Sequence, residues 1–138
     1  PGRIAGYQAW HMDHHGWGDI AYHYIIGRDG TVYEGRDPAF RGDTGTSYDT
    51  TGHLLVVLEG HLDHDKPTDA QIDSLTKVMA WAADAYGIDP SWMLGHRHHP
   101  GAHTTCPGKH LMALIENGYL AGAANQLRSG GGAVLTTP

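Results

Sequence analysis

Apolar and polar positions near the start of the chain recur with the period of an α-helix. The residues that share one face, at spacings i, i+3, i+4 and i+7, are Ile4, Tyr7, Gln8 and His11. This pattern predicts a helix from Arg3 to His11 that ends near the polar run Asp13-His14-His15-Gly16.

The next part of the chain has the composition of β-strands. Residues 20–26 form one run rich in β-branched and aromatic side chains, and Arg28-Asp29-Gly30 predicts a hairpin turn into a second strand, Thr31–Glu34. Residues 37–52 are rich in Gly, Thr, Asp and Ser, which predicts a long surface loop of the kind that usually carries function. The uninterrupted apolar run Leu54–Leu58 then predicts a central strand covered on both faces.

Two more helices follow. Thr68 and Gln71 have the spacing of a capping box, and an apolar stripe continues from there to Gly87 through Ile72, Leu75, Met79, Ala82 and Tyr86. A last helix is predicted from Lys109 to Asn117, because apolar residues share one face before Gly118: Leu111, Leu114 and Ile115. Helices flanking a small sheet give an α/β sandwich.

Length and charge narrow the possible functions. A chain of 138 residues indicates one domain that needs no disulfides, here expected over residues 1–128, with a flexible Gly-rich tail or linker over residues 129–138. The net charge of −6 argues against nucleic acid as a partner. No apolar stretch is long enough to span a membrane and no signal peptide is visible. We expect a monomer.

The only cysteine lies close in sequence to several of the twelve histidines. Cys106 follows His96 by ten positions, within the segments Gly95-His96-Arg97 and Thr104-Thr105-Cys106-Pro107-Gly108. A lone cysteine is usually a small buried apolar residue, but a thiolate and a neutral imidazole are also suitable ligands for Zn²⁺. Taken alone, the spacing leaves both interpretations open.

These two segments resemble the C-terminal signature of the zinc N-acetylmuramoyl-L-alanine amidases, the T7 lysozyme-like family of type 2 amidases that includes the peptidoglycan recognition proteins. A second block, from Tyr7 to Arg36, is similar to the same family almost residue for residue. The resemblance extends from about Arg3 to Gly118 and implies an α/β fold with a mixed central β-sheet flanked by about three α-helices.

The resemblance also implies a Zn²⁺ cofactor held by His96, Cys106 and a histidine on a first strand that this sequence does not contain. Either that strand is missing here, or another histidine substitutes, or the chain does not hold zinc tightly. In the family the two ligands are usually eight residues apart, a separation that His98 and Cys106 would satisfy. We favour His96 because Trp92–Leu94 is interpreted as a strand that ends at it, and a ligand needs a rigid base.

The remaining site residues follow from the resemblance by position. Tyr22 and Thr104 are the candidate catalytic residues, which would orient the attacking water and donate to the oxyanion. Arg36 and Tyr48 are candidates for binding the stem peptide. Strand alternation points His23 away from Tyr22, so it receives no role in the site. Structural roles are preferred for three further residues of the motif: His11, Asp13 and Trp17.

The expected function is therefore hydrolysis of the amide bond between N-acetylmuramic acid and L-alanine in peptidoglycan. Such an enzyme would act at the bacterial cell wall, as a secreted autolysin or a phage-encoded bacteriolytic endolysin. The alternative is a peptidoglycan-binding module without catalysis. With two of the three family ligands, this chain is expected to retain little metal, to have little activity and to expose one edge of its sheet.

Overall fold

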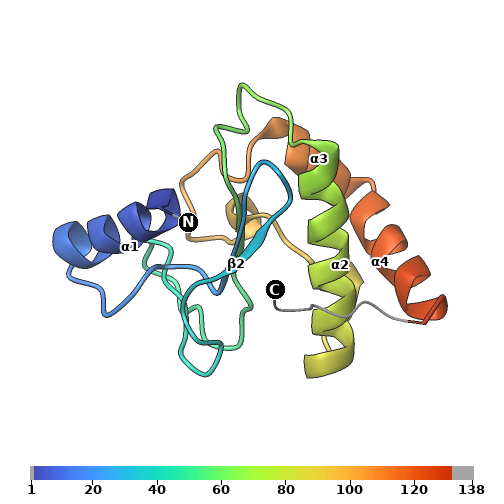
Figure 1. The fold of residues 1–138 in the computed structure, drawn as a ribbon, viewed down its shortest axis with the longest axis horizontal. Coiled ribbons are helices and arrows are strands. Elements are labelled where there is room, and N and C mark those ends of the chain that lie inside the picture. Colours follow the sequence, from blue (N-terminus) through green and yellow to red (C-terminus); the bar gives the residue numbers. More distant parts are fainter. Residues whose placement is uncertain (1, 132–138) are drawn as a thin grey trace.

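The computed structural model describes residues 2–131 of the chain. An α/β fold with a mixed sheet is confirmed, and the described residues form four α-helices where about three were expected (Figure 1). The elements in chain order are α1 (Gly2–His15), β1 (Tyr24–Ile26), β2 (Val32–Glu34), β3 (Val56–Leu58), α2 (Asp69–Tyr86), the 3₁₀ helices η1 (Pro90–Trp92) and η2 (His96–His98), α3 (Lys109–Glu116) and α4 (Tyr119–Ser129).

The sheet has three short strands in the order β2-β1-β3. β1 pairs antiparallel with β2 and parallel with β3. The predicted central position of Leu54–Leu58 is therefore wrong, because β1 is central and β3 pairs on one side only within residues 2–131. Only Leu58 of that run is buried, whereas all of β1 is buried. An apolar run indicates burial but does not identify the strands beside it.

The predicted hairpin is confirmed. The Gly27 N–H donates to the Thr31 carbonyl at 2.9 Å, and the Asp29 carboxylate accepts from the Thr31 N–H at 3.0 Å. Gly30 has a φ of 86°, a conformation that other residues rarely adopt. This turn places β2 directly beside β1, which is why β1 becomes the middle strand.

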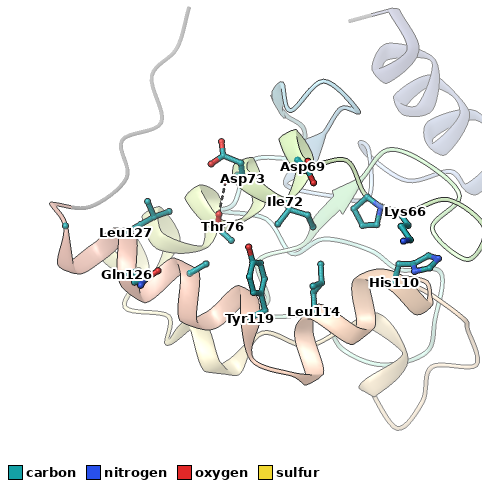
Figure 2. Close-up of a pocket in the computed structure, with 13 residues that line it drawn as sticks. Lys66, Asp69, Ile72, Asp73, Thr76, His110, Leu114, Tyr119, Gln126 and Leu127 are labelled. Atoms are coloured by element: carbon teal, nitrogen blue, oxygen red, sulfur yellow. Dashed lines mark hydrogen bonds between the residues drawn. The ribbon is translucent and has the colours of Figure 1, made fainter.

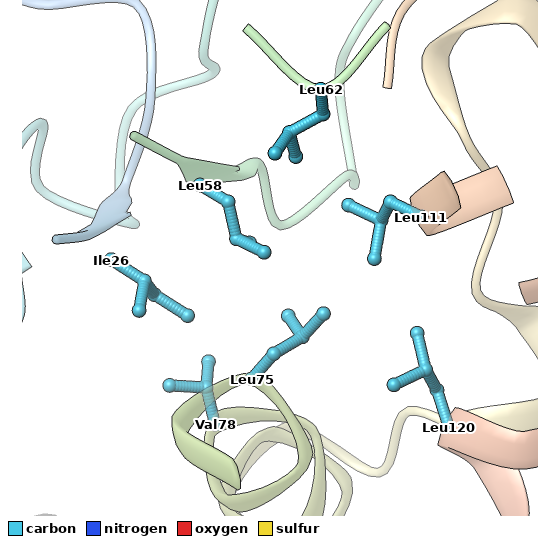
Figure 3. Packing of buried hydrophobic residues seen from close by; sticks show 7 residues of the cluster. All are labelled: Ile26, Leu58, Leu62, Leu75, Val78, Leu111 and Leu120. Atoms are coloured by element: carbon cyan, nitrogen blue, oxygen red, sulfur yellow. The ribbon is translucent and has the colours of Figure 1, made fainter. Parts of the chain in front are cut away.

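The helix α2 begins and ends where the sequence predicts. The Thr68 hydroxyl accepts from the Gln71 N–H, the Gln71 side chain accepts from the Thr68 N–H, and Gly87 ends the helix in the left-handed conformation. Figure 1 shows α4 lying beside α2, with α3 across their upper end. The main core lies between these helices and the sheet (Figure 3), and its buried members are Ile26, Leu58, Leu62, Leu75, Val78, Leu111 and Leu120.

The helix α1 is longer than predicted and buries none of its residues. It lies apart from α2 and α4, with the strands between them (Figure 1). Polar contacts connect it to the rest of the protein: Arg3 pairs with Glu59 at 2.6 Å, Gln8 donates to Asp19 at 2.6 Å, and the His11 ring accepts from a backbone N–H at 3.2 Å.

One further prediction needs correction, and one helix was not foreseen. Trp92–Leu94 is not a strand, because Pro90 begins η1 and the Asp89 carboxylate caps it by accepting from Ser91, which curls the chain. Trp92 and Leu94 are 71% and 66% exposed. The helix α4 was not predicted at all.

The tail boundary at residue 129 stays a prediction. The helix α4 includes Ser129, and residues 132–138 of the proposed tail lie outside the described residues. No helix within residues 2–131 is long and apolar enough to cross a membrane.

Candidate functional site

Two hydrogen bonds from Arg97 hold together the segments that carry the predicted zinc ligands His96 and Cys106. The Arg97 N–H donates to the Cys106 carbonyl at 3.0 Å, and the Arg97 guanidinium donates to the Thr105 carbonyl at 2.7 Å. The η2 turn that carries His96 is thereby fixed to the loop that carries Cys106. Neither segment is a strand or a long helix, so the rigidity of this part of the site comes from these contacts.

A second set of contacts supports the Cys106 loop from the other side. The Thr105 hydroxyl donates to the Asp63 carboxylate, on the loop that follows β3. Gly108 has a φ of 88°, and a Cβ at this position would lie 2.3 Å from the Leu62 carbonyl group. The loop after β3 and the Cys106 loop therefore approach each other more closely than any side chain at position 108 would allow.

The histidine rings distinguish the two candidate ligands in this region. The Nε2 atom of His96 is buried and has no hydrogen-bond partner among residues 2–131. In contrast, the His98 Nδ1 accepts from the Gly95 N–H at 3.2 Å, and its Nε2 lies 3.5 Å from the Glu116 carboxylate. An unpaired buried nitrogen fits metal ligation, so the geometry favours His96 although the strand used to argue for it does not exist.

The ionisation of His96 is also compatible with a ligand. Burial lowers the pKa of its imidazole, and the nearby His99 lowers that pKa further. The ring is therefore more completely neutral at pH 7 than a solvent-exposed histidine, and neutral imidazole is the form that binds metals. The role of His96 as a ligand stays a prediction.

Cys106 is an exposed residue overall, yet its surroundings affect its thiol. Burial of the sulfur raises the thiol pKa, Arg97 opposes this shift, and Asp63 adds to it. Without a metal the thiol is therefore protonated at neutral pH. The Cys106 N–H donates to the Thr104 hydroxyl at 3.1 Å, which leaves the hydroxyl proton of Thr104 free to donate elsewhere.

Tyr22 lies on a segment that is held on both sides. The Arg36 N–H donates to the Tyr22 carbonyl at 2.9 Å, and the Asp43 N–H donates to the Ala21 carbonyl at 3.0 Å. Burial raises the pKa of the Tyr22 phenol, and the neighbouring Cys106 and Tyr48 raise it further. The phenol is therefore protonated at neutral pH and can act as a hydrogen-bond donor.

Tyr48 reaches the same region from the long loop between β2 and β3. Its ring stacks on His99 with centroids 3.5 Å apart and meets His96 edge-on at 5.8 Å. His99, which received no role in the sequence analysis, is half-buried in this stack. No spacing signal in the sequence pairs residues 48 and 99, so their contact could not be foreseen.

Arg36 is largely committed to the protein backbone. Its Nε, Nη1 and Nη2 groups donate to the carbonyls of Ile20, Arg41 and Asp19 at 2.9, 2.8 and 2.9 Å. These three bonds join the segment before Tyr22 to the long loop. The predicted role of Arg36 in binding substrate stays a prediction.

A third metal ligand is not evident in the described part of the chain. Within residues 2–131, no three His, Cys, Asp or Glu side chains come close enough together to hold a metal ion. Both ring nitrogens of His23 are hydrogen-bonded, and the His11 Nδ1 accepts from the Ala21 N–H. Of these two possible substitutes, only His11 keeps an uncommitted nitrogen.

A large groove lies elsewhere in the molecule. A groove of about 930 Å³ lies between α2 and the pair α3–α4 (Figure 2). Its apolar floor includes Ile72, Leu114 and Leu127, and Asp69 and Asp73 lie on its rim. It contains none of the predicted site residues, so it is separate from the predicted site.

Comparison with known proteins agrees with the motifs. A family model described as N-acetylmuramoyl-L-alanine amidase matches residues 3–109. Peptidoglycan-recognition protein SC2 of Drosophila melanogaster is 34% identical over 110 residues, which are 79% of this chain and 58% of that protein. Human N-acetylmuramoyl-L-alanine amidase is 33% identical over 110 residues, 78% of this chain and 19% of the human protein. The chain thus spans less than two thirds of these relatives.

The fold is similar as well. The crystal structure of the Drosophila peptidoglycan recognition protein SD superposes with a TM-score of 0.74 at 30% sequence identity. The match covers 83% of this chain and 67% of that one.

Proposed function

Because this chain belongs to the N-acetylmuramoyl-L-alanine amidase family, we propose that it cleaves the amide bond between N-acetylmuramic acid and L-alanine in peptidoglycan. The partner is then the muramyl peptide of the bacterial cell wall, which is also where the protein would act. Autolysin and phage endolysin are both compatible with this activity.

One observation carries the proposal: three separate segments bring chemically suitable side chains to one place. Tyr22, Tyr48 and Cys106 are close enough for the latter two to raise the pKa of the first. The Tyr48 ring contacts His96, whose turn is bonded to the Cys106 loop. Residues up to 84 positions apart in the sequence therefore lie around one region and offer residue types that amide hydrolysis uses, which supports the proposal.

The residues present fit part of a zinc site. His96 offers a buried Nε2 without a partner, and Cys106 offers a sulfur that ligation would deprotonate. When bound, zinc would polarise the scissile carbonyl and lower the pKa of a water molecule. A catalytic zinc site generally uses three protein ligands, and the third is not found within residues 2–131.

The chain's own residues then have distinct tasks in the proposed reaction. The protonated phenol of Tyr22 donates a hydrogen bond, which orients the attacking water or stabilises the negative charge that develops on the carbonyl oxygen. The Thr104 hydroxyl supplies a second donor, since its oxygen already accepts from the Cys106 N–H. Tyr48, and Arg36 in the predicted role, contact the stem peptide.

A second function is supported by the ligand count. A peptidoglycan-binding module without catalysis needs the predicted peptide-binding residues Arg36 and Tyr48 but no complete metal site, and only two of the predicted ligands are present in the described residues. The two functions differ in one observable: both retain the muramyl peptide, but only the enzyme releases peptides with a new N-terminal alanine.

The test uses purified peptidoglycan and an excess of Zn²⁺, because two protein ligands are expected to lose zinc during dialysis. We expect peptides with N-terminal L-alanine to appear. Cys106→Ser should reduce their rate of release by more than the roughly 10- to 100-fold that loss of a residue supporting a metal ligand costs. Binding of peptidoglycan without release would establish the non-catalytic function.

A matched pair of variants tests the choice of ligand. His96→Ala should abolish zinc-dependent activity, whereas His98→Ala should keep it, because His98 has other partners for both nitrogens. The reverse result would assign the ligand to His98. Stoichiometric zinc after dialysis of the unmodified chain would reveal a third ligand, and His11 would be the first residue to replace.

A further inference from the structure

The side chain of His23 is among the most completely buried polar groups in the protein, with 2% of its surface exposed. Its Nδ1 accepts from the Leu55 N–H at 2.8 Å, and its Nε2 lies 2.9 Å from the Phe40 carbonyl. A backbone N–H can only donate and a carbonyl can only accept. The imidazole must therefore be neutral with its proton on Nε2, which donates to Phe40.

These two bonds join three parts of the chain. His23 directly precedes β1, Leu55 leads into β3, and Phe40 belongs to the long loop of residues 37–52. The side chain of Phe40 is 67% exposed, so burial of that side chain does not hold this turn of the loop in place. The turn is connected to the rest of the protein by the bond from the imidazole to the Phe40 carbonyl and, one residue later, by the bond from the Arg36 guanidinium to the Arg41 carbonyl.

The same loop delivers Tyr48 to the candidate site. Between the turn and Tyr48 the loop is fixed by the Asp43 N–H, which donates to Ala21, and by the Thr50 hydroxyl, which donates to the Gly42 carbonyl at 2.6 Å. His23, Arg36 and Ala21 are therefore successive anchors of the loop, and loss of the bond to Phe40 would remove the first of them and weaken the support of residues 42–50. Tyr48 would then lose its stacked position on His99.

We propose that His23 is a positioning residue for substrate binding, which fixes the loop of residues 37–52 so that Tyr48 faces the muramyl peptide. The substrate named here rests on the proposed function, whereas the fixing of the loop by His23 does not depend on that function. His23 and Tyr22 are neighbours in sequence but have different roles. Tyr22 faces the site, and His23 fixes the loop that carries Tyr48 to the site.

Two substitutions test the two hydrogen bonds of His23 separately. An asparagine side chain places its oxygen near the position of Nδ1, so His23→Asn keeps the bond from Leu55 and loses the bond to Phe40. A glutamine side chain places its amide nitrogen near the position of Nε2, so His23→Gln keeps the bond to Phe40 and loses the bond from Leu55. His23→Asn therefore releases the loop from His23, and His23→Gln weakens the connection between β1 and β3.

The experiment measures amide hydrogen exchange of residues 37–48, the thermal midpoint, and KM and kcat for a soluble muramyl peptide. In His23→Asn the loop amides should exchange about tenfold faster and KM should rise about tenfold with kcat little changed, as loss of one hydrogen bond implies. In His23→Gln the loop amides and KM should stay at wild-type values while the thermal midpoint falls.

Loop exchange at the wild-type rate in a folded His23→Asn protein would overturn the proposal. So would a fall in thermal midpoint in both variants with no change in KM, because that is the result of a purely structural role. If the wild-type protein does not turn over, the proposed function fails, whereas the exchange difference between the variants still tests the fixing of the loop.

A measurement on the unmodified protein covers the case in which a variant does not fold. Nitrogen-15 NMR of the histidine rings should show His23 with a slowly exchanging proton on Nε2 and none on Nδ1. A proton on Nδ1 would exclude the bond from Leu55 and overturn the proposal.

Discussion

The two longest helices of the described chain, α1 and α2, are held by different means. The 18-residue α2 buries seven of its residues and has a defined cap at each end. The 14-residue α1 buries none and is held by polar contacts with Glu59, Asp19 and Ala21. Both sequences have apolar residues at helical spacing. The spacing therefore predicts a helix, but it does not say whether the helix has a surface to pack against.

This difference has consequences for stability. Polar contacts at an exposed surface contribute little, while each large buried side chain contributes much more. We infer that α2 is part of the cooperative core and that α1 can open locally without unfolding the protein. Three predictions test this comparison.

The largest difference is expected between Leu75→Ala and Tyr7→Ala. Leu75 on α2 is 1% exposed, so its truncation should lower the free energy of unfolding by about 2–5 kcal/mol. Tyr7 on α1 is 42% exposed, so its truncation should change that free energy by less than about 0.5 kcal/mol. Urea unfolding followed by circular dichroism measures both. Similar losses for the two variants would place α1 in the core.

A medium effect is expected at the capping box. Thr68→Ala removes the acceptor for the Gln71 N–H and the donor to the Arg28 carbonyl, and should lower the free energy of unfolding by about 1 kcal/mol. Thr68→Ser is the matched control, because it keeps the hydroxyl and should retain most of the stability. If serine and alanine are equally destabilising, the methyl group of Thr68 matters and the cap does not.

The smallest effect is a pH dependence that originates at α1. Burial lowers the pKa of His11 below 6.5, and His15 and Arg36 lower it further while Asp43 opposes them. As the pH falls, the His11 ring is therefore protonated in the unfolded chain before it is protonated in the folded protein. The contribution of His11 to stability is complete above pH 6.5 and declines as the pH falls below that value. The ring also loses its acceptor for the Ala21 N–H when Nδ1 is protonated.

His11→Asn isolates this effect, because asparagine keeps an acceptor near the position of Nδ1 and does not titrate. The urea midpoint of this variant should fall less between pH 7.5 and 5.5 than that of the wild type, to an extent of about one hydrogen bond or less. An unchanged slope would mean that His11 titrates equally in the folded and unfolded chain.

Local signals were sufficient for part of the fold. The capping box at Thr68, the left-handed Gly87 and the Asp29-Gly30 turn each act through contacts within a few residues, and all three were predicted correctly. The order of the strands was not predicted correctly, because an apolar run such as Leu54–Leu58 indicates a strand but does not identify the strands beside it. Trp92–Leu94 failed for a related reason, since Pro90 and the Asp89 cap outweigh the strand propensity of three residues.

The candidate site shows the same limit. The resemblance to the amidase family pointed to Tyr22, Tyr48, His96 and Cys106, which the structure brings into one region. The contacts that support them could not be predicted, because His99, Asp63 and His23 act across long sequence separations and belong to no spacing pattern. The choice of His96 over His98 likewise depends on which ring nitrogen lacks a partner, and only the folded chain shows this.

The close approach of Gly108 to Leu62 has a consequence for how this protein can change. Even the single methyl group of alanine at position 108 would have to push the Cys106 loop away from the loop after β3, and the sulfur would move with it. Insertions near Leu62 would have the same effect from the other side. The two loops therefore have to vary together in length and path. The loop after β3 contains no proposed catalytic residue, yet it restricts how the Cys106 loop can change in evolution.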